Sequence, residues 1–575
     1  MQRLTPLSLE YEWDILSEKR PIPSSVEEAL WDYPPVLRQL FFNRNIYTKE
    51  EAEAFLHPSL EKAHDPWTMI GMQAAVDRIL YAIQKGEKIA IYGDYDVDGI
   101  SGTALLYDFL KNLGAEVLPY LPNRFVEGYG VRPEGLRSLR DQGVKLVITV
   151  DCGARANNEA EYAHSLGLDL IITDHHQPHR ENPSAICMLN PKQKGEGYPY
   201  PELSGAGIVY KLIQALEQTL RPTNPIAHEY LDLVALGTIA DVAPLDGENR
   251  ILVSNGLAQL RKTRRIGLRA LIAVSGLKPE ALNAYHVGYI LAPRLNAAGR
   301  LDSAYAAFEL LTTSDPKQAV KLAQELDNRN RERQELTLQH DLCASRQVLQ
   351  SLDKSPLLIT FDPNYNLGVI GLVAAHLVET FYRPAIVATE SNGLIRGSCR
   401  SIPEFHITQA LDECCDLIEY HGGHAAAAGF TIRKENFAEL RHRLEQIARR
   451  EFSKKRLRPT LHADLPLDLN ELGKLLREYP LFFALEQFQP TGYGNPSPSF
   501  VSFGLRPTRV RKFGKDQNHL SFEVAPAWKC IAFRLGALAE KLTHRIDLLY
   551  HIERDVYDGS DILRLNVRDL KPSKL

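Results

Sequence analysis

The feature that most constrains this chain is an alternation of apolar, strand-like runs with helical patterns that begins near residue 88. Strand-like runs cover Ile89–Tyr92, Leu146–Val150 and Leu170–Thr173, and helical patterns over Gly102–Leu113 and Glu159–Leu166 lie between them. Such alternation is typical of a parallel β-sheet with helices on both faces. The expected fold class is therefore α/β.

Acidic and imidazole side chains follow these strands at the points where the strands end. They are Asp94, Asp96 and Asp98, expected in one loop after the first strand, Asp151 after the second, Asp174, His175 and His176 after the third, and Asp241 after an apolar helix over Leu231–Ala240. Open α/β sheets bind their ligands outside the carboxyl ends of the strands. A mixed carboxylate and imidazole set suits manganese or a related divalent ion, and there are enough ligands for two ions bridged by a shared carboxylate. The residue types alone predict a two-metal hydrolase that acts on a phosphate ester or anhydride.

Each of these motifs has a plainer explanation when it is taken alone. The alternating aspartates near Asp96 resemble a calcium loop, although the Gly and Glu spacing of an EF-hand is absent. A single aspartate at a strand end, such as Asp151 or Asp241, is often a helix cap or a turn residue. The coincidence of acids at successive strand ends favours the functional interpretation.

The length and composition bound the rest of the chain. With 575 residues, it exceeds a single hydrophobic core, and three or four domains are expected. A content of 44% hydrophobic and 24% charged residues is that of an ordinary soluble protein, and no apolar run approaches the roughly 18 residues of a membrane span. Residues Met1–Glu10 lack the pattern of a secretory signal. The seven cysteines contain no Cys-x-x-Cys pair, which favours reduced thiols and a cytoplasmic location.

Beyond the first sheet, the pattern changes twice. A long helix is expected from Ser314 or Asp315, with Pro316 in its first turn, towards Gln350; its polar centre, Asp327–Glu335, is expected to bridge two domains through solvent. A second α/β unit follows this helix. After residue 456, short strands separated by turns predict a small β-barrel or sandwich, for which an OB-type barrel is the candidate. The expected divisions are 1–70 (N-terminal segment), 71–250 (catalytic domain), 251–353 (a region that ends in the long helix), 354–455 (second α/β domain) and 456–575 (barrel).

The net charge of −5 does not by itself favour a nucleic-acid partner. Local charge is more informative, because net charge averages over the acids of a metal site. Two clusters contain no acid: Arg261, Lys262, Arg264, Arg265 and Arg269 form the first, and Arg506, Arg509, Arg511, Lys512 and Lys515 form the second. Each cluster could be a solvated face or a phosphate track.

Taken in order, the acidic motifs resemble those of the DHH phosphoesterase superfamily. The matching stretches are 93–99, 150–153, 174–176 and 240–244. Three further stretches, 292–300, 422–430 and 490–496, are similar to signatures of the RecJ family within it. The resemblance covers nearly the whole chain from about Trp13. It implies a DHH domain, a long connecting helix, a DHHA1 domain and an OB-fold domain, which agrees with the organisation read from the sequence pattern.

The resemblance implies an exonuclease that removes 5′ mononucleotides processively from single-stranded DNA, in recombination and repair, with two Mn²⁺ or Mg²⁺ ions. A helicase and a single-strand-binding protein are candidate further partners, and a monomer is expected. Three alternatives stay open: a DHH phosphodiesterase on short oligonucleotides or related small substrates, a catalytically inactive scaffold that binds single strands, and a pure single-strand-binding module. The barrel argues against the first, the complete set of acids and histidines argues against the second, and the acid-rich first half argues against the third.

The resemblance also assigns metal ligands. It implies that Asp96 and Asp98 bind the two metals, that Asp151 bridges them, and that His175 and Asp241 complete the second site. The carboxylates and cations together would activate a water for attack on phosphorus.

Three neighbouring residues receive supporting roles. The resemblance places His176 near the scissile phosphate, as a phosphate contact or proton donor, and gives Asp174 the task of orienting the histidine pair. Asp94 is expected to bind a metal weakly or to contact the metal ligands without binding a metal itself.

The same resemblance indicates substrate-binding residues in three places. They are Arg294, Asn296 and Arg300; Gly422, Gly423 and His424; and Arg396 and Arg400. Arginine binds phosphate in a bidentate manner, although each of these arginines could instead pair with a nearby carboxylate. Cys399, between Arg396 and Arg400, is as well explained by packing of a buried thiol. In the barrel, Phe513, Arg509 and Lys512 are a hypothetical path for the strand, through stacking and charge.

Overall fold

The structure is a computed structural model that describes residues 10–124, 127–221, 223–301, 303–352, 355–453, 457–479, 481–525, 528–555 and 562–574. The chain forms two compact units, one of residues 1–13 and 328–461 and the other of residues 14–327 and 462–575. The domain divisions expected at 353/354 and 455/456 lie outside the described residues.

The catalytic part of the larger unit is built on a parallel sheet, as predicted. Its strands are β2 (Lys88–Gly93), β3 (Val117–Tyr120), β4 (Val144–Val150), β5 (Asp169–Thr173) and β6 (Cys187–Leu189), in the order β3-β2-β4-β5-β6. The chain adds β3 on one side of β2 and then β4 on the other, so the direction of winding reverses between β2 and β4. Open sheets of this kind bind ligands at that switch point.

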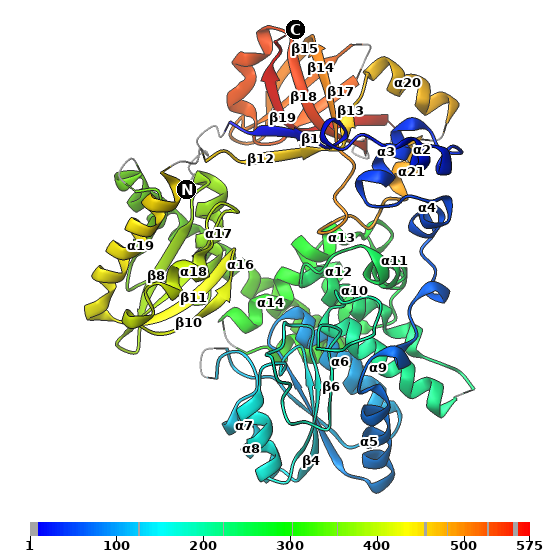
Figure 1. The fold of residues 1–575 in the computed structure, drawn as a ribbon, viewed down its shortest axis with the longest axis vertical. Coiled ribbons are helices and arrows are strands. Elements are labelled where there is room, and N and C mark those ends of the chain that lie inside the picture. The colour runs from blue at the N-terminus through cyan, green and yellow to red at the C-terminus, as the bar shows by residue number, and fades with distance from the viewer. Residues whose placement is uncertain are drawn as a thin grey trace. The chain divides into compact units, whose positions relative to one another are not determined.

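Helices cover both faces of this sheet (Figure 1). They are α5 (Met72–Lys85), α6 (Val97–Asn112), α9 (Gly205–Leu220) and α10 (Leu231–Ala240) on one side, and α7 (Pro133–Asp141) and α8 (Asn157–Ser165) on the other. Alternate strand residues face the two sides: Ile89 and Ile91 belong to the larger buried cluster, whereas Ala90 and Tyr92 belong to the smaller one. Period-two alternation of fully buried residues explains why these strands read as continuous apolar runs.

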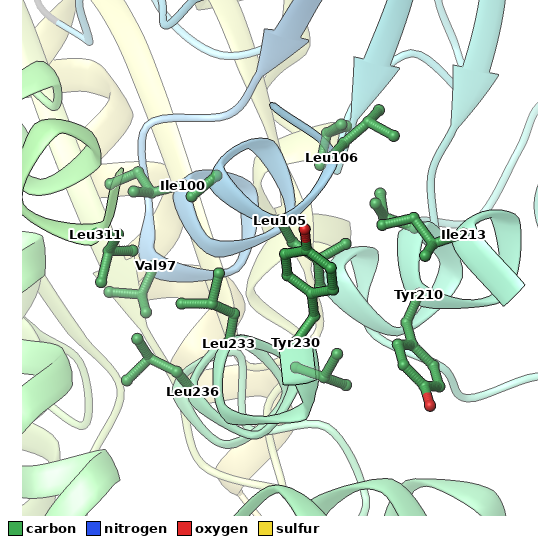
Figure 2. Packing of buried hydrophobic residues seen from close by; sticks show 14 of the residues in the cluster. Val97, Ile100, Leu105, Leu106, Tyr210, Ile213, Tyr230, Leu233, Leu236 and Leu311 are labelled. Carbon is green, nitrogen blue, oxygen red and sulfur yellow. The ribbon is translucent and has the colours of Figure 1, made fainter. Parts of the chain in front are cut away.

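Figure 2 shows part of the large buried cluster, in which Val97, Leu233 and Leu236 lie close to one another and Tyr210 lies further along the same cluster. These side chains come from α6, α9 and α10. Every residue of α10 from 231 to 239 is buried. Dense packing of this kind resists small displacements. The core therefore fixes α6, α9 and α10, and with them the ends that carry the acidic side chains.

A helical region follows the sheet. Its elements are α11 (Gly247–Arg261), α12 (Ile266–Val274), α13 (Ala284–His286), a π-helical turn η5 (Val287–Leu291), α14 (Ala292–Leu301), α15 (Tyr305–Thr312) and α16 (Pro316–Ser351). Within the first basic cluster, Arg265 is largely buried and pairs with Asp108 and Asp232. The prediction of a solvated face or phosphate track is therefore wrong for Arg265, because its charge is already neutralised inside the fold.

Helix α16 connects the two units, as predicted, since the division between them falls at residues 327 and 328. The expectation that its polar centre is solvated is wrong at Asp327. This carboxylate is 1% exposed and pairs with Arg294 at 2.9 Å. A buried charge requires a partner of opposite sign, and the sequence pattern could not reveal this one.

The smaller unit contains a five-stranded mixed sheet in the order β10-β11-β9-β8-β7. The strands are β7 (Leu358–Phe361), β8 (Ala385–Ser391), β9 (Leu394–Arg400), β10 (Ile418–His424) and β11 (Ala427–Arg433), with helices α17 (Ile370–Phe381), α18 (Ile407–Asp412) and α19 (Phe437–Phe452). Cys399 is fully buried in the core of this sheet, in agreement with a packing role.

The C-terminal part of the larger unit is a seven-stranded sheet in the order β13-β14-β18-β19-β17-β16-β15. Its elements are β13 (Leu465–Pro466), α20 (Leu469–Glu478), α21 (Leu481–Glu486), β14 (Phe500–Leu505), β15 (Pro507–Phe513), β16 (His519–Val524), β17 (Trp528–Ala532), β18 (Ile546–Asp555) and β19 (Ile562–Pro572). A separate pair is formed by β1 (Glu12–Ile15) and β12 (Thr460–Ala463).

The N-terminal helices share a hydrophobic core with this barrel. Residues of α3 (Pro35–Asn43) and α4 (Lys49–Leu56) pack with Phe488 and Phe500. Arg250 of α11 then joins the barrel to the catalytic part, because its guanidinium donates to backbone carbonyls of residues 55, 487, 488, 489 and 490. The barrel is thus held on the catalytic part by a buried arginine.

Two further expectations concern the chain as a whole. All seven cysteines are free. In the part of the chain that the structure describes, no helix combines the length and apolar character that crossing a bilayer requires.

Candidate metal centre

The three central strands β2, β4 and β5 end at the same edge of the sheet, and the acidic residue that follows each strand extends the sheet ladder by one hydrogen bond. The backbone N–H of Asp94 donates to Val150 O (3.1 Å), that of Asp151 to Thr173 O (3.0 Å), and that of Asp174 to Leu189 O (3.1 Å). Residues after parallel strands therefore meet at one edge of the sheet, as the sequence predicted.

The first motif combines a loop with a helix start. Asp96 caps α6, since its Oδ1 accepts from the N–H groups of Asp98 (3.0 Å) and Gly99 (3.2 Å). Asp98 therefore lies in the first helical turn, so the expectation of a loop that contains all three aspartates is wrong at this position. The cap explains the difference: a β-region aspartate at 96 satisfies orphan donors and begins the helix.

Asp98 is fixed by the start of helix α9. Its Oδ2 accepts from Gly205 N (2.6 Å) and its Oδ1 from Ala206 N (3.0 Å). The positive end of a helix dipole stabilises a carboxylate there. The motifs of acidic residues did not indicate this contribution of Gly205. The Ser204-Gly205-Ala206-Gly207 stretch, with a serine cap before small residues, was the available signal.

Asp151 occupies a left-handed backbone conformation, with φ of +63°. Asp and Asn are among the few residues other than glycine that adopt this conformation without large strain. A side chain at Gly205 would place its Cβ 2.7 Å from Asp151 Cβ. The site therefore depends on a glycine opposite this carboxylate.

The third motif orients its histidines through Asp174. This buried carboxylate accepts from Ala154 N (2.7 Å) and His176 N (3.1 Å), and its Oδ1 lies 2.8 Å from His176 Nδ1. The hydrogen bond between them raises the pKa of His176 despite the opposing effect of burial, and lowers the pKa of Asp174 despite its burial. A carboxylate in this position fixes the ring and leaves His176 Nε2 as the atom directed away from that contact.

Asp241 ends helix α10 at the same edge. The following loop has an unusual backbone, with Val242 at φ of +60°, and is held by Leu245 N donating to Tyr493 O (2.7 Å). The 490–496 stretch, which the resemblance singled out, thus contacts the loop behind Asp241.

Ligand atoms converge in three overlapping groups. These are Asp94, Asp96 and Asp151; Asp151, His175 and His176; and Asp98, His175 and Asp241. Within each group, the candidate ligand atoms lie within 4.8 Å of one another. Asp151 and His175 each belong to two groups. Shared ligands are what a two-ion centre needs.

The electrostatics of these groups fit cations. Asp94 Oδ1, Asp151 Oδ1 and His175 Nε2 are buried and have no hydrogen-bond partner among the described residues, although Asp151 Oδ1 and His175 Nε2 lie 3.0 Å apart. Buried polar atoms are normally satisfied, so orphans at one point indicate an absent partner. Burial, together with neighbouring aspartates, raises the pKa of Asp98 to about 7 and of Asp241 to about 9. Burial also lowers the pKa of His175 to about 3, which keeps its imidazole neutral and able to bind a metal.

These shifts predict a pH-dependent effect of metal on stability. The pKa values of Asp98 and Asp241 in the fold lie above the ordinary carboxyl value, so the metal-free fold binds more protons than the unfolded chain and loses stability as pH rises from about 4 through about 9. A divalent cation replaces those protons and binds more tightly as they leave. We expect the rise in melting temperature on adding Mn²⁺ to be larger at about pH 8 than at about pH 6. Thermal unfolding in EDTA and in Mn²⁺ measures it; an equal or smaller rise at the higher pH contradicts the assignment.

A cavity of about 330 Å³ opens over these ligands. Its walls are Asp94, Tyr95, Asp96, Arg124, Tyr129, His176, Ala240, Asp241, Asn296, Gly299 and Arg300. Asn296 and Arg300, predicted as substrate residues, thus lie at the metal-ligand groups. Arg294 does not line this cavity: it pairs with Asp327 and donates to Ile290 O (2.7 Å), so part of its guanidinium serves the fold.

The sequence pattern did not indicate three residues that line this cavity, Tyr95, Arg124 and Tyr129. Arg124 lies over the ring of Tyr95, 5.2 Å from its centroid, and Tyr129 Oη lies 3.1 Å from His176 Nδ1. All three residues follow strand ends, at β2 and β3. The Gly128-Tyr129-Gly130 stretch, in which both glycines have positive φ, was a usable signal for a tight loop at the edge of the sheet.

The remaining predicted substrate residues belong to the smaller unit. Gly422, Gly423 and His424 lie on the edge strand β10, and Arg396 and Arg400 on β9. Gly423 has a φ of +145°, and a Cβ there would lie 2.3 Å from Ala427 O. Only glycine fits this backbone position.

Comparison with known proteins agrees with this architecture. Family models match in the order of the predicted domains: "DHH family, N-terminal domain" over residues 88–238, "DHHA1 domain" over 354–450 and "RecJ OB domain" over 463–569. The fold and its acidic edge therefore define a protein of the DHH class, with DHHA1 and OB domains.

Individual relatives identify the family within the DHH class to which the chain belongs. The chain is 37% identical to the single-stranded-DNA-specific exonuclease RecJ of Bacillus subtilis, over 99% of this chain and 72% of that protein. It is 33% identical to the exonuclease of the same name from Dickeya dadantii, over 97% and 100% of the two chains. The crystal structure of Thermus thermophilus RecJ in complex with Mn²⁺ is similar with a TM-score of 0.81 at 30% identity, over 96% of this chain and 78% of that one. The chain belongs to the RecJ family.

Proposed function

We propose that this protein is a metal-dependent exonuclease that degrades single-stranded DNA. The observation that carries the proposal is the set of three overlapping ligand groups at the end of the parallel sheet, joined through Asp151 and His175. Membership of the RecJ family supports the substrate, since its relatives bear the name of single-stranded-DNA-specific exonucleases. We further propose the 5′→3′ direction and the release of 5′ mononucleotides that the resemblance of the sequence motifs implies.

The residues present fit two ions of Mn²⁺ or Mg²⁺. We assign Asp94, Asp96 and Asp151 to one ion, and Asp98, His175 and Asp241 to the other, with Asp151 also facing the histidine pair. This assignment gives Asp94 a fuller role than the sequence predicted, because its buried Oδ1 has no protein partner among the described residues. When bound, such ions activate water and neutralise charge on the leaving oxygen.

The side chains around the ions would hold the substrate and move a proton. His176, whose raised pKa favours the protonated ring, is suited to contact a phosphate oxygen or to protonate the leaving oxygen through Nε2. Asp174 and Tyr129 hold the Nδ1 side of that ring. Arg124 and Arg300 line the cavity, where guanidinium groups can bind phosphate oxygens.

The smaller unit contains the other residues that we propose to contact the substrate. There, Gly422, Gly423 and His424 on an edge strand offer backbone N–H groups to phosphates, and Arg396 and Arg400 offer charge. We further propose a role in recombination and repair, action as a monomer in the cytoplasm, and a helicase and a single-strand-binding protein as sources of substrate.

The test of this function is product analysis with three substrates. Single-stranded DNA, duplex DNA and RNA of one sequence, each labelled at the 5′ end, are incubated with the protein and Mn²⁺. We expect labelled mononucleotides from single-stranded DNA alone. Release of internal fragments, or equal cleavage of the duplex, would contradict the proposal, and no cleavage of any substrate would favour the inactive scaffold.

A second prediction concerns the barrel. Arg509, Arg511 and Lys512 are exposed on β15, an edge strand, and Arg509 also pairs with Glu523. If these cations follow the DNA backbone, replacing all three with alanine should weaken binding of long single strands. It should also reduce the slope of log affinity against log salt by about 0.7 for each phosphate that the protein no longer neutralises. Exposed Arg137 and Arg140 on α7 provide a matched control. An unchanged slope in the barrel variant would exclude this path.

A further inference from the structure

We infer that Tyr285 and Tyr289 form a stacking platform for the unpaired bases of a strand whose phosphate is held in the metal-site cavity. This inference rests on the proposed function and adds a base-binding subsite to it. The two tyrosines belong to α13 and the π-helical turn η5, which lead into α14 (Figure 1).

The two rings are exposed in a way that packing does not explain. Tyr285 is 61% and Tyr289 is 74% exposed, and their rings stack with centroids 5.0 Å apart and planes inclined by 28°. Large aromatic side chains usually bury most of their surface. Two stacked rings that remain exposed offer flat apolar faces of the kind on which nucleic-acid bases stack.

The backbone that carries the two tyrosine rings is held rigidly. Val287 lies between the two tyrosines in the sequence, Leu291 follows them, and both side chains are fully buried. Asn283 Oδ1 caps the segment by accepting from His286 N (3.1 Å). Arg261 Nε donates to Leu282 O just before the segment (2.9 Å). Rings on a fixed backbone lose little freedom when a ligand binds. A π-helical turn is also rare, and such turns are frequent at functional sites.

The platform is close to the cavity along one helical segment. Asn296 and Arg300, which line the cavity, follow Tyr289 on the continuous stretch η5 to α14. Asn296 lies seven positions after Tyr289, a helical rise of about 10 Å, or roughly three stacked nucleotides. A Cβ at Gly288 would lie 3.5 Å from Ile239 Cγ2, two residues before Asp241. The rings therefore lie within reach of the first bases beyond the bound phosphate.

The charge around the platform favours a nucleic acid over an apolar protein partner. Arg261, Lys262 and Arg264 are exposed. Arg261 also donates a hydrogen bond to Leu282 O, in the segment that leads into Tyr285. A positively charged groove with aromatic side chains is the common form of single-strand binding that does not depend on sequence.

The test combines removal of the tyrosine rings from the protein with removal of single bases from the DNA. Affinity is measured with Ca²⁺ in place of Mn²⁺, at a concentration at which no cleavage is detected, for the full chain and a 5′-phosphorylated single strand in which one abasic residue replaces each of the first six nucleotides in turn. The wild-type protein should lose affinity about 5-fold or more when the abasic residue falls opposite the platform. In the double variant Tyr285→Ala, Tyr289→Ala, the intact strand should bind more weakly by a similar factor, and the abasic residue should then have no further effect. Tyr289→Phe should bind like the wild type, because the ring is kept.

Controls separate the platform from the metal centre and from the proposed function. Tyr81→Ala removes an exposed ring on α5, and should leave the abasic profile unchanged. The double variant should bind Mn²⁺ like the wild type in calorimetry, which shows that the site is intact. The platform is overturned by an abasic profile that is the same in the double variant and the wild type. It is also overturned if the double variant loses binding to a protein partner but keeps its affinity for DNA. Failure of the wild type to cleave single strands in Mn²⁺ would instead count against the exonuclease itself.

Discussion

Replacing Asp151 with asparagine is expected to abolish hydrolysis of single-stranded DNA while leaving the fold intact. Asp151 is the carboxylate common to two of the three ligand groups. Its amide counterpart cannot carry the negative charge that holds two cations together. We expect activity with Mn²⁺ to fall at least about 1,000-fold, which corresponds to about 4 kcal/mol of activation free energy.

Asparagine is the informative substitution here because it separates charge from backbone conformation. Position 151 has a φ of +63°, which asparagine tolerates as well as aspartate does. Burial and the neighbouring aspartates raise the pKa of Asp151, so the ionised carboxylate is unfavourable without metal. The variant should therefore be at least as stable as the wild type in EDTA, and should gain less in melting temperature from Mn²⁺. Loss of stability in EDTA would show that Asp151 acts through folding, and retained activity would remove it from the metal centre.

The sequence predicted the sheet and its acidic edge because both follow from short-range patterns. Apolar runs of strand length, separated by helical periods, define a parallel sheet, and the carboxyl ends of parallel strands must lie at one edge. Asp94, Asp151 and Asp174 could therefore be placed together without knowing any contact. The family model matches confirm the DHH, DHHA1 and OB organisation that the motif resemblance implied.

Contacts between distant segments could not be predicted in this way. The pairing of Arg294 with Asp327, and that of Arg265 with Asp108 and Asp232, joins residues that no local pattern connects. The sequence left two interpretations open for each of these arginines, one of them phosphate binding, because a basic residue carries no local mark of its partner. The helix cap at Asp96 caused a smaller difference between the prediction and the structure. It begins helix α6, so Asp98 lies in a helix and not in the predicted loop.

Gly205 illustrates a site residue that sequence chemistry overlooks because it has no side chain. Its N–H donates to Asp98 Oδ2, and its missing side chain leaves room for Asp151. One backbone position thus supports carboxylates from two different ligand groups. A substitution there should disturb the centre without changing any ligand.

We expect Gly205→Ala to reduce hydrolysis of single-stranded DNA by about 100-fold or more and to raise the Mn²⁺ concentration needed for activity, because displacement of catalytic groups by about 1 Å has effects of this size. An alanine Cβ would lie 2.7 Å from Asp151 Cβ, so the carboxylate or the start of α9 must move. Gly207→Ala, on the same helix, is the matched control, since its Cβ would meet Leu203 and Ser204 at an ordinary 3.5 Å. Activity against Mn²⁺ concentration, with thermal unfolding in EDTA, distinguishes the two variants. If both variants keep wild-type activity, the contact between α9 and Asp151 does not position the metal centre; if both lose it equally, the start of α9 tolerates no side chain and the effect is one of packing.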